Sequence, residues 1–234
     1  RNLTELAGVR LSLRDPLKEV GRANFFLSYH GLDNRNLQTR IAQLYENACP
    51  SLLWTAPHCS APRARHGRIR IGFISKFMFH HSIGRITQGV LANISREQFE
   101  TYALFVPPFV EDDVSTFIRK HADKTVIVQP SIEAARKQIA ELELDVLFYQ
   151  DIGMEPFTYF LAFARLAPVQ CVFFGHPDTT GIRNMDYFIS NDLFEPENAQ
   201  EHYSEKLFLL HDLGAPTYYY KPGLTETLKG REAF

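Results

Sequence analysis

The chain has 234 residues, of which 45% are hydrophobic and 22% charged, and its formal net charge is −2. These values are typical of a folded globular chain and exclude a disordered, collagen-like or coiled-coil protein. No run approaches the roughly 18 apolar residues of a membrane span, so we expect no membrane partner. The three cysteines, Cys49, Cys59 and Cys171, lack CxxC spacing. They argue against a disulfide scaffold or a structural zinc site and favour a reducing compartment, so we expect a cytoplasmic protein.

The charge is divided unevenly along the chain. Residues 1–70 carry 11 Lys and Arg against 5 Asp and Glu, whereas the remainder carries 14 against 22. The densest basic run, residues 61–70, has no interleaved aromatic side chains for base stacking and no nucleic-acid motif around it. We therefore interpret this run as a solvated linker and expect no nucleic-acid partner.

Residues 1–66 have the pattern of a helical connector followed by a linker. Apolar residues at helical spacing predict a first helix that ends at Gly31 and a second that Asp33 or Asn34 caps and Pro50 ends. The residues on these faces are Leu17, Val20, Ala23, Phe26 and Leu27 in the first helix, and Leu37, Ile41, Leu44 and Ala48 in the second. We interpret the pair as a helical hairpin, and residues 51–66 as a linker that packs only in part.

From residue 67 onward, short apolar strands alternate with helices. The expected strands are 68–74, 99–106, 125–128, 145–149, 169–174, 187–190 and 206–210. The expected helices are 83–94, 110–121, one capped by Ser131, 156–166 and 196–203. This rhythm predicts an α/β fold, a single Rossmann-like lobe over residues 67–234 with a parallel sheet and helices on both faces.

Ligands of such sheets bind in the loops that follow the carboxyl ends of strands, and three loops qualify. The first contains His80 and His81 at a helix N-terminus, where the helix dipole favours neutral imidazole. A neutral imidazole can accept a proton or bind a sugar hydroxyl, but a histidine here can also simply cap the helix. In the second loop, Asp151 is followed by Gly153, and its carboxylate either binds a ligand or caps the next helix.

The third loop, residues 174–181, combines two glycines, a proline and four polar side chains, those of His176, Asp178, Thr179 and Thr180. A tight turn of this composition exposes backbone amides and suits ligands rich in hydroxyl or phosphate groups. It contains neither GxxxxGK[ST] nor GxGxxG, and the chain has no GxSxG elbow and no zinc-ligand spacing. The residues by themselves predict a polar binding loop and no more.

Several stretches resemble the O-linked N-acetylglucosamine transferases and their bacterial relatives. The longest is residues 167–190, which contains Ala-Pro-Val-Gln, then Gly175-His-Pro-Asp-Thr-Thr-Gly181, then Met185-Asp-Tyr187. The segment Tyr203-Ser-Glu-Lys-Leu207, the strand Arg70-Ile-Gly-Phe-Ile-Ser75 with His81 after it, and the connector 23–31 are similar to other parts of that family. The resemblance covers nearly the whole chain.

The resemblance implies a GT-B enzyme with two Rossmann-like lobes behind tetratricopeptide repeats. Such enzymes transfer N-acetylglucosamine from UDP-GlcNAc to Ser or Thr of proteins, with inversion and without a catalytic metal. We therefore expect a UDP-sugar donor and a protein or peptide acceptor as partners, and no cofactor. His81 matches a histidine regarded as a base or a substrate-positioning group, and Phe174, Gly175 and Pro177 match the loop lining the sugar pocket. The candidate substrate-binding residues are His80, Asp151, Phe174, Gly175, His176, Pro177, Asp178, Thr179 and Thr180.

The sequence also departs from the family pattern. His81-Ser-Ile replaces His-Pro-Thr, and Asp145 stands where animal members carry a histidine, so no role is assigned to Asp145. Gly175-His176 replaces the animal Gly-Tyr, as in some bacterial members, which favours a bacterial-type enzyme. The second lobe, which carries an essential lysine in the family, is not in this sequence, and residues 229–234 resemble the crossing into it. We therefore expect an N-terminal catalytic lobe that is nearly inactive by itself.

Two alternatives to this interpretation stay open at this point. The first is a glycosyltransferase with a different sugar donor or acceptor, because a shared fold does not determine the donor. The second is a non-catalytic interaction module, in which residues 1–60 bind a partner and the Rossmann-like unit is a scaffold.

Overall fold

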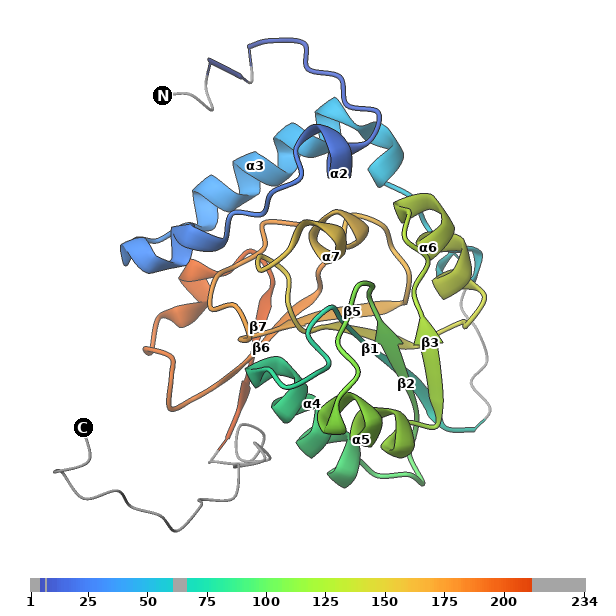
Figure 1. Cartoon of the computed structure of the whole chain (residues 1–234). Coiled ribbons are helices and arrows are strands. Elements are labelled where there is room, and N and C mark those ends of the chain that lie inside the picture. Colours follow the sequence, from blue (N-terminus) through green and yellow to red (C-terminus); the bar gives the residue numbers. More distant parts are fainter. Residues whose placement is uncertain (1–4, 7, 61–66, 212–234) are drawn as a thin grey trace, which may run out of the picture.

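The computed structural model describes residues 5–6, 8–60 and 67–211. Its centre is a seven-stranded sheet in which every neighbouring pair is parallel, in the order β3-β2-β1-β4-β5-β6-β7 (Figure 1). The strands are β1 Ile69–Ser75, β2 Phe99–Phe105, β3 Lys124–Ile127, β4 Val146–Tyr149, β5 Val169–Phe173, β6 Tyr187–Asn191 and β7 Lys206–Leu210. The predicted α/β class and parallel sheet are confirmed.

Helices cover both faces of this sheet, because alternate residues of each strand point to opposite sides. Phe73 and Phe105 pack in one cluster with residues of α4 and α5, while Ile74 and Leu104 belong to the larger cluster on the other face, with α6 and α7. The helices are α4 Ser82–Asn93, α5 Asp113–His121, α6 Ile132–Ala140 and α7 Pro156–Leu161, and a 3-10 turn, η4, covers Ala199–His202. Each helix expected after residue 67 is present, although the last is a 3-10 turn.

Some helix boundaries differ from the expected ones for local reasons. The helix expected over 110–121 begins at Asp113, because Asp112 caps it and exchanges hydrogen bonds with Ser115 in a capping box. The helix expected over 156–166 ends at Leu161. Its cap is Glu155, whose carboxylate accepts the N–H groups of Phe157 and Thr158, so the expectation that Asp151 caps this helix is wrong.

The first connector helix is not the continuous helix that the spacing predicted. It is divided into α2, Pro16–Glu19, and a 3-10 helix, η1, Phe25–His30. Gly21 with φ +62° follows α2, and Gly31 with φ +65° ends η1. Both values lie in the left-handed region, where an α-helix cannot continue and where glycine is favoured. The expected stop at Gly31 is confirmed.

The second connector helix, α3, covers Arg35–Ala48 and begins after Asn34, close to the prediction. Its most buried face, however, runs through Gln38 and Ala42, one position away from the expected Leu37 and Ile41, which are half-buried. Short 3-10 turns follow at η2, Pro50–Leu52, and η3, Pro57–Cys59. Gln38 is buried at the centre of this face because its side-chain amide donates a hydrogen bond to Asp178.

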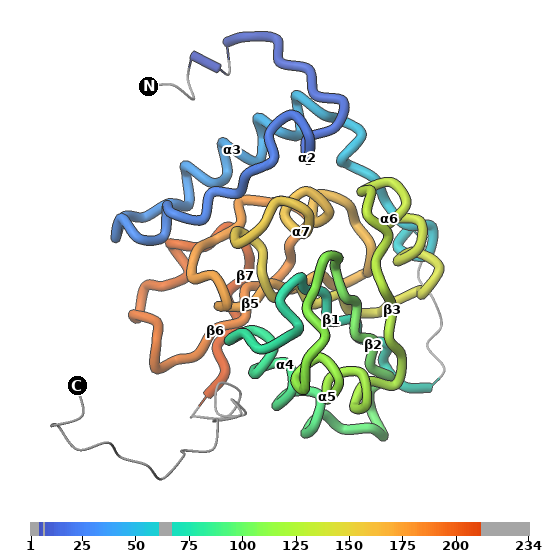
Figure 2. Tube along the Cα trace, viewed as in Figure 1, coloured from blue at the N-terminus to red at the C-terminus, as the bar shows by residue number. Residues whose placement is uncertain are grey.

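The connector packs on the face of the sheet that also carries α6 and α7 (Figure 2). Tyr45 of α3 makes edge-on ring contacts with Tyr159, Phe160 and Phe163, and Ala42, Cys49 and Leu52 belong to the same core cluster. The division into a connector (1–66) and a lobe (67–234) stays a prediction, since 61–66 and 212–234 lie outside the described residues.

Candidate functional site

The strand order places a topological switch point between β1 and β4. The chain leaves β1 toward β2 and β3 on one side, and β4 then pairs with the other edge of β1. In doubly wound sheets the ligand crevice lies outside the carboxyl ends of the two strands at such a point. The first two candidate loops follow β1 and β4, and the third follows the next strand, β5.

Two glycines bring the three loops into contact. A Cβ on Gly175 would lie 2.4 Å from Ile83 Cδ1, at the start of α4, and 2.5 Å from the Gln150 carbonyl oxygen, at the end of β4. A Cβ on Gly153, whose φ is +96°, would lie 2.6 Å from Nδ1 of His176. The loops therefore form one contiguous surface, and these glycines make the close approach possible.

His81 occupies the N-cap of α4, where its Nδ1 accepts a hydrogen bond from the Ile83 N–H at 3.2 Å. Its ring stacks on Phe77, with 4.8 Å between centroids, and burial lowers the pKa of the imidazole. A neutral ring whose Nδ1 is an acceptor carries its proton on Nε2. No group in the described part of the chain bonds to Nε2 of His81, so this N–H can be donated to a ligand.

His80 differs from its neighbour in position and partners. The residue is exposed, its Nε2 lies 2.9 Å from a guanidinium nitrogen of Arg85, and its backbone N–H donates to Asp112 Oδ2 at 2.6 Å. The ring therefore contacts α4, and the backbone contacts the N-cap of α5. The structure brings His81, but not the His80 side chain, to the stacked rings of the first loop.

Asp151 connects the ends of β1 and β4. Its Oδ2 accepts the Ser75 hydroxyl at 2.9 Å and the Lys76 N–H at 2.8 Å, and the residue is 0% exposed. Burial, together with the nearby Glu155 carboxylate, raises the pKa of Asp151 well above its usual range. Its Oδ1 is buried without a hydrogen-bond partner among the described residues. Asp151 therefore joins the end of β4 to the end of β1 by hydrogen bonds, and a substrate-binding role for it stays a prediction.

His176 and Asp178, in the third loop, are held by the connector. Nε2 of His176 donates to the Phe25 carbonyl oxygen at 3.0 Å, and the residue is 3% exposed. Asp178 Oδ2 accepts the side-chain amides of Asn34 at 3.1 Å and Gln38 at 3.0 Å. Burial raises the pKa of Asp178, while these amide donors oppose the rise.

Thr179 and Thr180 are held from the opposite side by Glu205, which is 2% exposed. The Thr179 hydroxyl donates to Oε2 at 2.7 Å, and the Thr180 N–H donates to Oε1 at 2.9 Å. The Thr180 hydroxyl donates to the same Oε1. All four polar side chains of the loop thus bond to protein, and their substrate-binding roles stay predictions.

The apolar members of the third loop occupy more open positions. Pro177 is exposed and Phe174 is half-buried. The centroid of the Phe174 ring lies 3.8 Å from that of Phe173 and 5.5 Å from that of Phe194. Phe194 follows β6 and is 59% exposed. Phe174, Gly175 and Pro177 are therefore less buried than His176, Thr179 and Thr180, and their role in lining a sugar pocket stays a prediction.

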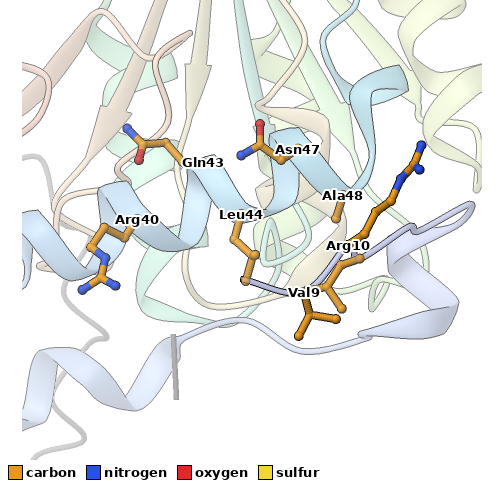
Figure 3. Close-up of a pocket in the computed structure, with 8 residues that line it drawn as sticks. Val9, Arg10, Arg40, Gln43, Leu44, Asn47 and Ala48 are labelled. Carbon is orange, nitrogen blue, oxygen red and sulfur yellow. The ribbon is translucent and has the colours of Figure 1, made fainter. Parts of the chain in front are cut away.

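A pocket of about 370 Å³ opens beside this loop, between residues 31–34 and 177–179, with His202 and Tyr203 at its edge. A second pocket, of about 240 Å³, lies away from the strand ends between residues 9–11 and α3 (Figure 3). Within the described ranges, no three His, Cys, Asp or Glu residues are grouped so that they could hold a metal ion. No helix in the part of the chain that the structure describes has the length and apolar character to cross a bilayer.

Several residues of this region escaped the sequence analysis. Glu205 lies in the Tyr-Ser-Glu-Lys-Leu motif, which was matched as a family feature without a role for its glutamate. Asn34 was expected only as a helix cap, but its side chain makes no capping bond and reaches Asp178 instead. Gln38 and Ser75 gave no local signal, because their partners lie 140 and 76 positions away in the chain.

Fold and loops together define a doubly wound α/β protein whose candidate ligand loops follow β1, β4 and β5, next to the β1/β4 switch point. The family model for glycosyl transferase family 41 matches residues 35–215. The chain belongs to glycosyl transferase family 41.

Two curated relatives illustrate the range of the family. The probable UDP-N-acetylglucosamine–peptide N-acetylglucosaminyltransferase SEC of Arabidopsis thaliana is 24% identical over 141 residues, covering 60% of this chain and 14% of that protein. The UDP-glucose:protein N-beta-glucosyltransferase of Actinobacillus pleuropneumoniae serotype 5b (strain L20) is 27% identical over 142 residues, covering 61% and 22%. The chain thus spans less than a quarter of the length of these relatives.

A solved structure supports the fold. A mutant O-GlcNAc transferase from Thermobaculum terrenum superposes with a TM-score of 0.61 at 24% identity, covering 74% of this chain and 33% of that one. The resemblance to an O-linked N-acetylglucosamine transferase-like family is confirmed at the level of family and fold. The comparisons leave the sugar donor open, since one relative is a glucosyltransferase.

Proposed function

We propose that this chain is the N-terminal catalytic lobe of a protein O-GlcNAc transferase that uses UDP-GlcNAc, inverts the anomeric centre and needs no catalytic metal. The observation that carries the proposal is His81, held in the crevice of a family 41 fold with its Nε2–H available to a ligand. The acceptor is a Ser or Thr hydroxyl of a protein. We also propose a bacterial source, tetratricopeptide repeats elsewhere in the protein and a cytoplasmic location, as the sequence motifs and cysteines suggest.

In this reaction the acceptor oxygen forms a bond to the anomeric carbon while the bond from that carbon to the diphosphate breaks, and the diphosphate leaves with the electron pair. Because Nδ1 of His81 is occupied by the Ile83 N–H, the neutral ring offers a hydrogen-bond donor and not a proton acceptor. We therefore assign His81 to orienting a substrate oxygen, and the acceptor proton passes to an oxygen of the departing diphosphate. Correct orientation of the reacting atoms is a large contribution to rate in such transfers.

Phe174, Gly175 and Pro177 form the wall of the sugar site in this proposal. The polar side chains beneath them fix the loop, so that its backbone and the Phe174 ring face the crevice. Positive groups that stabilise the leaving diphosphate belong to the second lobe. The 234-residue chain is therefore nearly inactive without that lobe.

A glucose donor is the second candidate, because the relative from Actinobacillus pleuropneumoniae is named a UDP-glucose:protein N-beta-glucosyltransferase. The test is to express the full reading frame that contains this chain and to supply UDP-GlcNAc or UDP-glucose with a Ser- and Thr-containing peptide. Mass spectrometry of the peptide then separates a HexNAc from a hexose adduct, and an EDTA arm tests the need for a metal. If neither donor supports transfer, the proposal is overturned. Robust transfer by the 234-residue chain alone would contradict the proposal that this chain is nearly inactive without the second lobe.

A further inference from the structure

The connector grips the third loop through a network of side-chain amides. Asn34 and Gln38, one helical turn apart, both donate to Oδ2 of Asp178, at 3.1 and 3.0 Å. Asn24 Nδ2 donates to Gln38 Oε1 at 3.3 Å, which turns the Gln38 NH₂ group toward Asp178. Asn34 Nδ2 also donates to the Leu27 carbonyl oxygen at 3.2 Å. Each amide is therefore fixed at a second point.

Two more contacts join the same partners. The His176 ring donates to the Phe25 carbonyl oxygen of η1. The backbones of α3 and the loop also touch, since a Cβ on Gly181 would lie 2.3 Å from the Gln38 carbonyl carbon and 2.4 Å from its oxygen. The loop is thus tied to the connector near its beginning, its middle and its end.

The side chains of this network are polar, although the buried face of a helix that packs on a protein core is usually apolar. Gln38 is 4% exposed and Asn34 is 7% exposed, on the helix face that joins the main core. Buried amides are costly unless they are hydrogen-bonded, so their presence on this face is explained by the carboxylate that they meet. Glu205 binds Thr179 and Thr180 from within the sheet domain, whereas these amides bind Asp178 from the connector.

We propose that Asn34 and Gln38 are positioning residues that latch the loop 175–181 to the connector, so that the placement of the connector controls the geometry of the sugar site. The consequence for catalysis rests on the proposed function. Through this latch, displacement of η1 and α3 by a partner bound to the connector shifts Phe174, Gly175 and Pro177, although neither amide touches the sugar.

The test reverses the polarity of the latch. Gln38→Glu places a second carboxylate against Asp178, and Asp178→Asn combined with Gln38→Glu restores a donor–acceptor pair in the opposite direction. Gln43→Glu, the same change at an exposed position of the same helix, is the matched control. The readout is hydrogen exchange of the backbone amides of residues 175–181 in the 234-residue chain, with circular dichroism as the check on folding.

Gln38→Glu is expected to speed exchange of the loop amides roughly tenfold or more, the factor that corresponds to losing a hydrogen bond to a charged group. The double variant restores exchange to within about threefold of the original chain, because one such bond is regained. Gln43→Glu leaves it unchanged. If Gln38→Glu does not fold, the isosteric variant Asp178→Asn takes its place. We expect Asp178→Asn to speed exchange of the loop amides, and the addition of Gln38→Glu to reverse that change. Equal loop exchange in Gln38→Glu and Gln43→Glu, or no rescue in the double variant, overturns the proposal.

The second readout is steady-state kinetics of the full reading frame. A displaced sugar loop raises KM for the sugar nucleotide and lowers kcat in Gln38→Glu, and the double variant recovers both, whereas a loss of stability alone reduces the amount of active enzyme at unchanged KM. Unchanged KM in folded Gln38→Glu enzyme contradicts control of the sugar site. If loop exchange responds to these variants as expected but the protein transfers no sugar, the contact between connector and loop is supported and the proposed function is overturned.

Discussion

The loops after β1 and β5, the first and third candidate loops, both contain histidine but use their polar side chains in opposite ways. In the first, His81 uses Nδ1 to cap α4 and leaves Nε2 without a partner in the described part of the chain. In the third loop, the side chains of His176, Asp178 and Thr179 and the backbone of Thr180 all bond to protein groups. The first loop therefore leaves one hydrogen-bond donor available, whereas the third loop uses its polar side chains to hold its own shape.

This difference shows that polar residues in a ligand loop need not touch the ligand. The buried carboxylate of Glu205 holds the loop after β5 from within the sheet domain and touches no candidate ligand group, so its substitution should mainly change stability. Substitution of His81 should mainly change chemistry.

Glu205→Ala should have the largest effect. The change leaves the hydroxyl and the N–H of Thr180 buried without their acceptor, while the Thr179 hydroxyl keeps only Ser204 Oγ, at 2.9 Å. We expect the free energy of unfolding in urea to fall by about 3 kcal/mol or more, since each buried unsatisfied donor costs about 1–3 kcal/mol. Glu201→Ala, an exposed carboxylate nearby, is the control and should stay within about 0.5 kcal/mol. A loss no larger than that of the control would show that Glu205 does not hold the loop.

Gly175→Ala should have a moderate effect. The new methyl group would meet Ile83 Cδ1 at 2.4 Å and the Gln150 carbonyl oxygen at 2.5 Å, so the three loops must separate. We expect a loss of about 1–3 kcal/mol in unfolding free energy, as for other overpacked sites. Pro177→Ala, at an exposed position of the same loop, should cost no more than about 1 kcal/mol, from the greater entropy of the unfolded chain without the proline. Equal losses would mean that the close approach at Gly175 is not a constraint.

Asp151→Asn should change how stability depends on pH. Burial, and then the charge of Glu155, raise the pKa of Asp151, so the folded state favours the neutral acid. The stability that this group contributes is therefore present below its unfolded pKa, near 4, and is lost as pH rises toward the folded value. The asparagine variant keeps the acceptor for Ser75 and Lys76 but does not ionise. Its unfolding free energy relative to the original chain should increase from pH 4 to pH 7, and a constant difference would contradict the raised pKa.

The sequence predicted the fold well because the signals for it are local. The seven strands are apolar segments, and capped helices separate the first five of them. The predicted strand ends lie within one residue of the observed ends. The connector was predicted less well. Gly21 interrupts the apolar spacing that suggested one helix, and the buried face of α3 is shifted because Gln38 bonds to a loop that is distant in sequence.

The site was predicted in part for the same reason. The rule that ligand loops follow strand ends identified the three loops, and the family motif identified His81. Which side chains face inward depends on partners far along the chain, such as Asn34 for Asp178 and Glu205 for Thr180. Burial of Asp151 likewise follows from the pairing of β1 with β4 and leaves no mark in the local sequence.

The most direct measurement compares His81→Asn and His81→Ala in the full reading frame. The asparagine side chain can keep the cap on the Ile83 N–H but has no group at the position of Nε2. We expect His81→Asn to keep the original unfolding free energy within about 0.5 kcal/mol, whereas His81→Ala loses about 1 kcal/mol with the cap.

Sugar transfer should fall roughly 100-fold or more in both variants, because both lack the donor that orients the substrate. Transfer by a folded His81→Asn enzyme at the original rate would contradict the assignment of His81 to the chemistry and leave it as a helix cap only.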